Sequence, residues 1–422
     1  MASFRLIGCV CLAALLSAPA VLAHGLTEEA AEHNLRGVEH YNAGQWERAI
    51  DAFYDAHELA PDNATVRRNL CNAYQAYANT LAQGGDFETA AEVLKYAIDA
   101  DPGNASPLVQ LGSYNLRLDR LADAIFRLEE AVELAPEDED ALELLGDAYY
   151  RSNDLRLALD VWYELQDLAP NRPGLQDKIE KATREATVEH NFRRSGSRHF
   201  DISYPPGTTG REQNEVLSIL ERAYREIGRK LGNAFPTTPI QVIIYSAEEF
   251  SEATQLGEHV GAVYDGKIRV PVRNAEGGPI DSAELERRLF HEYTHVVVRH
   301  LAGERVPWWL NEGLAETFSK ELTDADYAGL RQAEMDDGLF VLSDLDASQL
   351  HAMPPHDLRL AYVQSHATVD YLWRRFGQRS LLAYLDALSE GVEPEEAMRQ
   401  VYRRTYLLLE REVSQEIRRR AP

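Results

Sequence analysis

Four prolines, at positions 61, 102, 136 and 170, each close a similar three-residue phrase: Leu-Ala-Pro, Ala-Asp-Pro, Leu-Ala-Pro and Leu-Ala-Pro. The last two intervals between them are 34 residues. A period of this size is typical of repeat architectures, in which one small unit buries its apolar face only by stacking on its neighbours. The first half of the chain is therefore predicted to be a stack of helical hairpins.

The side chains within each phrase agree with pairs of antiparallel helices. An alanine stands twelve positions before each proline and a large side chain eight before it: Ala49, Ala90, Ala124 and Ala158, then Phe53, Leu94, Leu128 and Trp162. Glycine takes the small position of the first helix in three units: Gly37, Gly112 and Gly146. The array resembles tetratricopeptide domains, and the resemblance implies a groove that binds peptides or proteins. A structural spacer that docks onto the rest of the chain is the alternative.

One repeat departs from the period, because Pro61 and Pro102 are 41 residues apart. The extra residues predict that the helix around Thr65 to Leu81 is about two turns longer than its counterparts. An amphipathic stretch from Leu175 to Ala186 is expected to cap the array. We therefore assign residues 24–188 to the repeat domain.

The residues before the array have the pattern of an export signal. An apolar stretch runs from Leu6 to Leu16, and small residues, with Val21 and Ala23 at the −3 and −1 positions, precede His24. Residues 1–23 are therefore predicted to be a signal peptide cleaved after Ala23, which implies a periplasmic or secreted protein. No other run reaches the roughly 18 consecutive apolar residues of a membrane span.

Charge and cysteine content limit the function classes. The formal net charge of −26 would repel a phosphate backbone over most of the surface, so nucleic acid is excluded as a partner. Cys71 is the one cysteine after the signal peptide, so no intramolecular disulfide is expected, and we interpret it as a buried structural side chain.

Different patterns begin after residue 190. Alternating apolar residues around Phe200 to Tyr204 and Ile240 to Ile244 predict two strands, and helical spacing from Val216 to Leu231 predicts a helix between them. Residues 261–272 predict further strand structure with a turn at Asp265-Gly266. Residues 192–422 are thus predicted to be an α+β domain that follows the all-α array.

The next predicted helix, from about Ala283 to Leu301, contains His291-Glu292-Tyr-Thr-His295. Histidines at i and i+4 lie on one helix face and can bind one zinc ion through both rings. The glutamate that follows the first histidine is then placed to act as general base, which makes Glu292 the candidate. Because a five-residue pattern also occurs by chance, the assignment needs a third ligand.

Glu312 is the candidate for that ligand. It lies in Pro307-Trp-Trp-Leu-Asn-Glu312-Gly-Leu-Ala-Glu316, where the proline fits the first turn of a new helix. A chain reversal before this helix would bring Glu312 beside both histidines and leave one zinc position open, as a catalytic site needs. Glu316, one turn further on, is placed to hold a ligand histidine through its other ring nitrogen.

These motifs together resemble the gluzincin peptidases, and most closely the compact peptidase MA-like domain. The resemblance covers roughly residues 195–380 and begins near Ser197-x-His199-Phe200. It implies a zincin-like fold with one zinc ion per chain on His291, His295 and Glu312, a peptide or protein substrate, and an oxyanion-stabilising tyrosine on a later helix. Tyr362 occupies the comparable place, and His366 is the alternative.

One departure from the family narrows the expected specificity. Aminopeptidases with this metal site carry a glutamate on an upstream strand that anchors the free amine of the substrate. Here the corresponding stretch begins Gly261-Ala262-Val263 and lacks that glutamate. These three residues are expected to pair with an extended substrate, and endopeptidase action is favoured.

Two other functions remain open. A zinc-binding scaffold or chaperone that acts through its repeats could carry the same domain without hydrolysing peptides. A second peptidase family joins the same histidine motif to tetratricopeptide repeats and membrane helices. The order of the domains and the Asn-Glu-Gly-Leu-Ala-Glu motif count against that second family.

Overall fold

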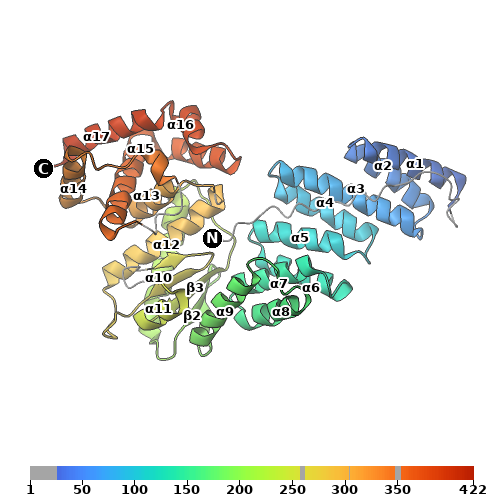
Figure 1. Cartoon of the computed structure of the whole chain (residues 1–422), viewed down its shortest axis with the longest axis horizontal. Coiled ribbons are helices and arrows are strands. Elements are labelled where there is room, and N and C mark those ends of the chain that lie inside the picture. The colour runs from blue at the N-terminus through green and yellow to red at the C-terminus, as the bar shows by residue number, and fades with distance from the viewer. Residues whose placement is uncertain (1–25, 257–261, 304, 347–352) are drawn as a thin grey trace. The chain divides into compact units, whose positions relative to one another are not determined.

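A computed structural model of the chain describes residues 26–256, 262–303, 305–346 and 353–422 (Figure 1). The contacts divide the chain into two compact units. The first comprises the described part of residues 1–149 together with residues 160–172, and the second comprises residues 150–159 and 173–422. The predicted signal peptide, residues 1–23, lies outside the described residues.

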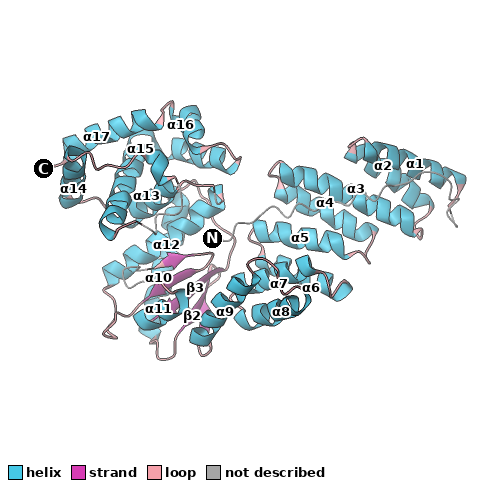
Figure 2. Ribbon diagram, viewed as in Figure 1, coloured by secondary structure: helices cyan, strands magenta, loops and turns pink. Residues whose placement is uncertain are grey.

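The first unit is built from helical hairpins (Figure 2). The pairs of the array are α1 (Glu28–Asn42) with α2 (Trp46–Leu59), α3 (Ala64–Gln83) with α4 (Phe87–Ala100), α5 (Ala105–Arg117) with α6 (Leu121–Leu134), and α7 (Glu139–Arg151) with α8 (Leu155–Leu168). Asparagine side chains begin two of these helices, because Asn63 accepts from the backbone of Thr65 and Asn104 from that of Ser106. The predicted repeat array is therefore confirmed as a run of helical hairpins.

Close packing between the helices of a hairpin explains the paired small and large positions. Gly112 on α5 faces Leu128 on α6, and a Cβ atom at Gly112 would lie 2.5 Å from Leu128 Cγ. The same pairing joins Gly37 to Phe53 and Gly146 to Trp162. A side chain larger than glycine fits at Gly112 only if the Leu128 side chain or the helices shift.

The irregular interval gives α3 its length. This helix has 20 residues, whereas α5 and α7 have 13 each, so the predicted extension of about two turns is confirmed. Cys71 on α3 is buried, and its thiol donates to Gln75 Oε1, 3.6 Å away. Burial raises the pKa of this thiol to about 12, which keeps it protonated and unreactive.

The second unit contains a five-stranded mixed sheet. The strands are β1 (Arg193–Gly196), β2 (Phe200–Tyr204), β3 (Ile240–Tyr245), β4 (Val263–Tyr264) and β5 (Ile268–Pro271). Their order in the sheet is β1-β2-β3-β5-β4. The pairs β2–β3 and β3–β5 are parallel, while β1 and β4 run antiparallel at the two edges. The predicted strands are confirmed, but sequence reasoning missed β1.

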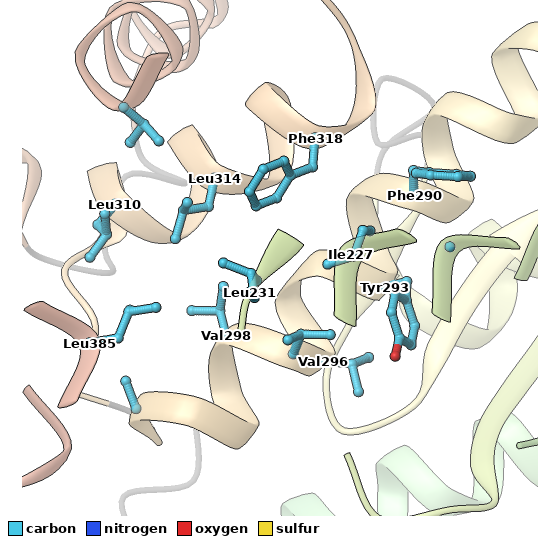
Figure 3. Packing of buried hydrophobic residues seen from close by; sticks show 14 of the residues in the cluster. Ile227, Leu231, Phe290, Tyr293, Val296, Val298, Leu310, Leu314, Phe318 and Leu385 are labelled. Atoms are coloured by element: carbon cyan, nitrogen blue, oxygen red, sulfur yellow. The ribbon is translucent and has the colours of Figure 1, made fainter. Parts of the chain in front are cut away.

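Helices cover both faces of this sheet. The larger core lies between one face of the sheet and two helices, α10 (Gly210–Lys230) and α12 (Ser282–Ala302). Figure 3 shows part of this core, where Ile227 of α10 lies near Tyr293 of α12. The opposite face presents Ile243 and Tyr245 to Phe250 of α11 (Ala247–Thr254). β3 is buried along its whole length, as expected for a strand enclosed between two helical layers.

The larger core continues into the C-terminal helices. Leu310 and Leu314 come from α13 (Trp308–Ser319), and Leu385 comes from α15 (Pro355–Ser389), which is interrupted at Gly377, where φ is 75° (Figure 3). The remaining elements are α14 (Asp324–Met335), the 3-10 turn η1 (Leu342–Leu345), α16 (Pro394–Tyr402) and α17 (Tyr406–Arg420). Among the described residues, no helix has the length and apolar character that crossing a membrane requires.

The helix α9 (Leu175–Glu189), expected to cap the array, belongs by its contacts to the second unit. It packs against α11, and its Val188 joins the small core on that face of the sheet. The predicted domain ranges of 24–188 and 192–422 remain a prediction, but the contacts place α9 and residues 150–159 with the sheet.

Candidate active site

The helix α12 is defined at both ends by its own sequence. Asp281 caps its start by accepting from the backbone nitrogens of Ala283 and Glu284, and Gly303 ends it with a φ of +66°. Its apolar residues, among them Leu289 and Tyr293, are buried in the larger core. The helix is thereby fixed between the sheet and α13, with its histidines toward α13.

Three side chains from α12 and α13 converge. His291 Nε2 lies 3.3 Å from Glu312 Oε2, and His295 Nε2 lies 3.5 Å from the same oxygen. One ligand atom from each of these residues lies within 4.8 Å of the other two. The two imidazole rings are nearly perpendicular, with centroids 4.9 Å apart. The structure thus brings together the three predicted ligands.

The second nitrogen of each ring faces an oxygen atom. His295 Nδ1 lies 3.0 Å from Asn311 Oδ1, and His291 Nδ1 lies 3.3 Å from Glu316 Oε1. Glu316 in turn forms a 2.5 Å ion pair with Lys320. Because both Nδ1 atoms face acceptors, each histidine directs Nε2 toward Glu312. Sequence reasoning assigned Glu316 this position but gave no role to Asn311 or Lys320.

The charges of this group reinforce one another. Burial would raise the pKa of Glu312, but the two histidines outweigh it and hold the pKa well below its usual range. Burial would likewise lower the pKa of His291, but Glu312 and Glu316 raise it to about 10. The pKa of Glu316 falls to about 2, because its contacts with His291 and Lys320 overcome its burial. Both acids are therefore ionised near neutral pH.

Glu292 follows the first histidine and is 5% exposed. Burial is the main cause that raises the pKa of its carboxyl, and His291 and His295 oppose that effect. A buried carboxylate with a raised pKa is suited to accept and return a proton near neutral pH. The assignment of Glu292 as general base stays a prediction.

Tyr362 on α15 borders the same group. Its ring meets Trp308 of α13 edge to face, with centroids 5.0 Å apart. Burial raises the pKa of its phenol, and the negative charges of Glu312 and Glu292 add to the effect, so the phenol keeps its proton. A protonated phenol beside these carboxylates can donate a hydrogen bond to an oxyanion.

His366, the alternative to Tyr362, lies in a different environment. It is 2% exposed, and burial lowers the pKa of its imidazole to about 4. Glu316 acts on both residues, but Asp370 and Asp326 act on His366, whereas Glu312 and Glu292 act on Tyr362. Tyr362 therefore remains the better candidate for the oxyanion donor.

The strand expected to pair with the substrate is partly described. Gly261 lies outside the described residues, Ala262 precedes β4, and Val263 begins it. β4 is an edge strand that pairs with β5 and packs against α12. The assignment of Gly261, Ala262 and Val263 to substrate binding stays a prediction.

The donor set fits a zinc ion. Two imidazole nitrogens and one carboxylate oxygen form the ligand set of hydrolytic zinc sites, in which a fourth position is left for water. Glu312 Oε2 is buried and, among the described residues, accepts no hydrogen bond. Because a buried acceptor without a partner is costly, a cation between Glu312 and the histidines would satisfy it.

Comparison with known protein families agrees with this geometry. Residues 228–415 match the Peptidase MA superfamily model. The matched range begins in α10, ends in α17 and includes all the predicted metal ligands, Glu292 and Tyr362. The second unit therefore contains a metallopeptidase-like domain.

Three solved structures are similar to part of the chain. The first TPR of Spaghetti (RPAP3), bound to an HSP90 peptide, shares 21% identity, with 28% of this chain and 93% of that chain covered and a TM-score of 0.27. A crystal structure of MamA shares 23% identity, covering 37% and 81%, with a TM-score of 0.30. MamA from Desulfovibrio magneticus RS-1 shares 20%, covering 37% and 91%, with a TM-score of 0.29.

The predicted fold class is confirmed. Helical hairpins form the N-terminal region, and a small mixed sheet with helices on both faces carries the peptidase-like domain.

Proposed function

We propose that this chain is an exported zinc-dependent metallopeptidase that cleaves within peptide chains. The observation that carries the proposal is the convergence of His291, His295 and Glu312 around one point, with Glu292 buried beside them. Fold alone does not define an activity, so the proposal rests on these residues and on their charges. Export is inferred from the signal-like pattern of residues 1–23.

Glu292 is the proton carrier of the reaction. A zinc ion held by His291, His295 and Glu312 would supply the Lewis acid that polarises the scissile carbonyl and acidifies a water molecule. The carboxylate of Glu292 accepts the proton that the attacking water loses, and it returns this proton to the leaving amine nitrogen. Its burial favours both transfers, since the raised pKa brings the protonated and ionised forms closer in energy.

Tyr362 is assigned the role of donating a hydrogen bond to the oxyanion. The attack places negative charge on the carbonyl oxygen only as the transition state forms, so a donor at that point stabilises the transition state more than the substrate. The edge-to-face contact with Trp308 holds the tyrosine ring, which limits the reorganisation needed during reaction.

The charge around β4 supports the proposal of endopeptidase action. Asp265 is the first acidic side chain after Val263, and it pairs with Lys181 at 2.6 Å and Arg269 at 3.2 Å. A carboxylate engaged by two cations is not available to bind a free amino terminus.

The repeat array is assigned to protein recognition or regulation. Polar side chains join successive first helices of the hairpins, as in the 2.8 Å hydrogen bond from Asn69 to Asn34 and the 2.7 Å bond from Tyr114 to Asn79. Stacked hairpins of this kind present extended binding surfaces. A peptide or protein partner therefore fits the first unit.

The test is Glu292→Gln, with Glu286→Gln as its matched control on the same helix. Glu286 is 44% exposed and forms an ion pair with Arg222, apart from the three predicted metal ligands. Zinc content should stay at one ion per chain in both variants. Cleavage of casein and of a peptide library should fall at least about 100-fold in Glu292→Gln and stay at the parental rate in Glu286→Gln.

Two results would reject parts of the proposal. A Glu292→Gln variant that cleaved casein at the parental rate would remove the assignment of the general base. A parent that bound one zinc ion and cleaved nothing would instead support the scaffold or chaperone function.

A further inference from the structure

A second group of charged residues lies on the face of the sheet that α9 covers. It consists of three acids and three bases: Glu185, Glu189 and Asp265, and Lys181, Lys267 and Arg269. We call these six residues the ionic cluster. All belong to the second unit, and the metallopeptidase mechanism uses none of them.

Arg269 is the centre of the ionic cluster. Its guanidinium is fully buried and donates to the carboxylates of Glu185 at 2.8 Å and Glu189 at 3.3 Å. The same group donates to the phenol oxygen of Tyr245 on β3 at 2.7 Å and, through Nε, to Asp265 at 3.2 Å. One side chain on β5 thus joins α9, β3 and the turn after β4.

Lys267 adds a second buried cation. Its ammonium donates to Asn153 Oδ1 at 2.7 Å and lies 3.9 Å from the ring centroid of Tyr150. Asn153 in turn donates to Glu189 at 2.9 Å. Each acid of the ionic cluster lies within 3.3 Å of a base, so removal of the buried Arg269 would leave an uncompensated charge in a buried site.

The strand β4 is joined to the ionic cluster through β5 and Asp265. β4 has only two residues, and Val263 pairs directly with Arg269 while Tyr264 pairs with Ile268. Such a short edge strand makes few backbone hydrogen bonds, and Ala262 and Tyr264 also pack against the larger core. Asp265 follows β4 immediately, and its side chain is bound to Arg269 Nε and Lys181 Nζ.

Charge therefore fixes the turn between β4 and β5. Burial would raise the pKa of Asp265, but the positive charges of Arg269 and Lys181 outweigh it and lower the pKa. The carboxylate stays ionised and paired at the pH at which the domain would work.

We propose that Asp265, held by Arg269 and Lys181, is a positioning residue that fixes the edge strand β4 beside α12 for pairing with an extended peptide substrate. This inference rests on the proposed peptidase function. Asp265 touches no reacting atom and acts through the position that it gives Val263 and Tyr264. Its loss should therefore weaken the binding of substrates that extend along β4 and leave metal binding intact.

The test compares Asp265→Asn with the matched control Glu334→Gln. Glu334 on α14 is likewise held by two cations, Arg331 at 2.5 Å and Arg418 at 2.7 Å, away from β4. Two substrates are used: an extended peptide, and a short chromogenic amide that spans only the scissile bond. Asp265→Asn should raise KM for the extended peptide about tenfold with kcat within about twofold, and should leave the short amide unchanged.

A measurement independent of activity accompanies the kinetics. Hydrogen–deuterium exchange at residues 262–265 should be faster in Asp265→Asn than in the parent, while exchange in α12 stays the same. Lys181→Met removes the exposed partner of Asp265 and should act in the same direction. Glu334→Gln should change neither exchange in β4 nor the two values of KM.

The inference fails if exchange in β4 is unchanged in Asp265→Asn, or if KM rises equally for both substrates. Failure of the proposed function looks different, because the parent and Glu292→Gln would then hydrolyse peptide at the same rate. In that case the exchange measurement still decides whether Asp265 holds β4.

Discussion

Gly313 on α13 is the position where one added methyl group should disturb both the packing and the metal ligands. A Cβ atom there would lie 2.5 Å from the carbonyl oxygen of Ser365 and 2.5 Å from Val369 Cγ2, both on α15. Ordinary contacts begin near 3.4 Å, so the two helices would have to separate by about 1 Å. The backbone carbonyl cannot rotate away, and overpacking of this kind costs about 1–3 kcal/mol.

Gly329 on α14 provides the control for helix propensity. It is exposed, and a Cβ atom there would meet nothing within 4 Å. Gly329→Ala should therefore stabilise the protein by about 0.5–1 kcal/mol, the ordinary advantage of alanine over glycine in a helix. Gly313→Ala receives the same advantage, so the difference between the two variants measures the steric cost, about 1–3 kcal/mol.

Urea unfolding of both variants gives this difference, and competition with a chelator gives their zinc affinities. Glu312 precedes Gly313 on α13, so separation from α15 should also weaken zinc binding, by about tenfold in Gly313→Ala and not at all in Gly329→Ala. If the two variants unfold at the same urea concentration, the close approach of α13 and α15 is not what requires glycine.

Two further predictions concern single side chains. Tyr362→Phe should keep one zinc ion per chain and lower kcat about 100-fold, and a parental kcat would remove the oxyanion role from this residue. The pKa of Glu284 is lowered to about 2, chiefly because its carboxylate accepts hydrogen bonds from Arg287 and Arg288, while burial opposes the shift. The ionised carboxylate therefore stabilises the folded protein above its unfolded pKa, and this stabilisation is lost as pH falls from about 5 toward 2. Because the Glu284 side chain is 35% exposed, we expect Glu284→Gln to lower the free energy of unfolding by only about 1 kcal/mol at pH 7. The difference in urea midpoint between parent and variant should narrow at pH 3, and equal differences at both pH values would contradict this.

The repeat array could be predicted in detail because its packing is local and periodic. The spacing of the prolines predicted the helical hairpins, and the 41-residue interval predicted the greater length of α3. β1 could not be found in this way. Its residues, Arg193–Gly196, are all exposed and show no apolar alternation, so its pairing with β2 depends on backbone hydrogen bonds that sequence patterns do not show.

The ionic cluster was equally hidden in the sequence. Asp265 was predicted only as part of a turn, and Arg269 interrupts an otherwise apolar strand. A charged residue in such a strand normally indicates an exposed face, whereas here α9 covers that face and supplies the acids. The partners are separated by about 80 residues in sequence, so only the three-dimensional packing brings them together.

The arrangement of His291, His295 and Glu312 shows why the short histidine motif was informative but did not by itself define a metal site. A helix with histidines at i and i+4 directs both rings to one side, yet each ring can present either nitrogen. Asn311 Oδ1 and Glu316 Oε1 lie beside the two Nδ1 atoms, and both Nε2 atoms face Glu312. The acceptors lie one position before the third ligand and four after it, so a single helix, α13, supplies the ligand and also fixes which nitrogens face it. The constraint that brings two histidines and a carboxylate together as a candidate metal site therefore lies in the spacing of residues on a second helix.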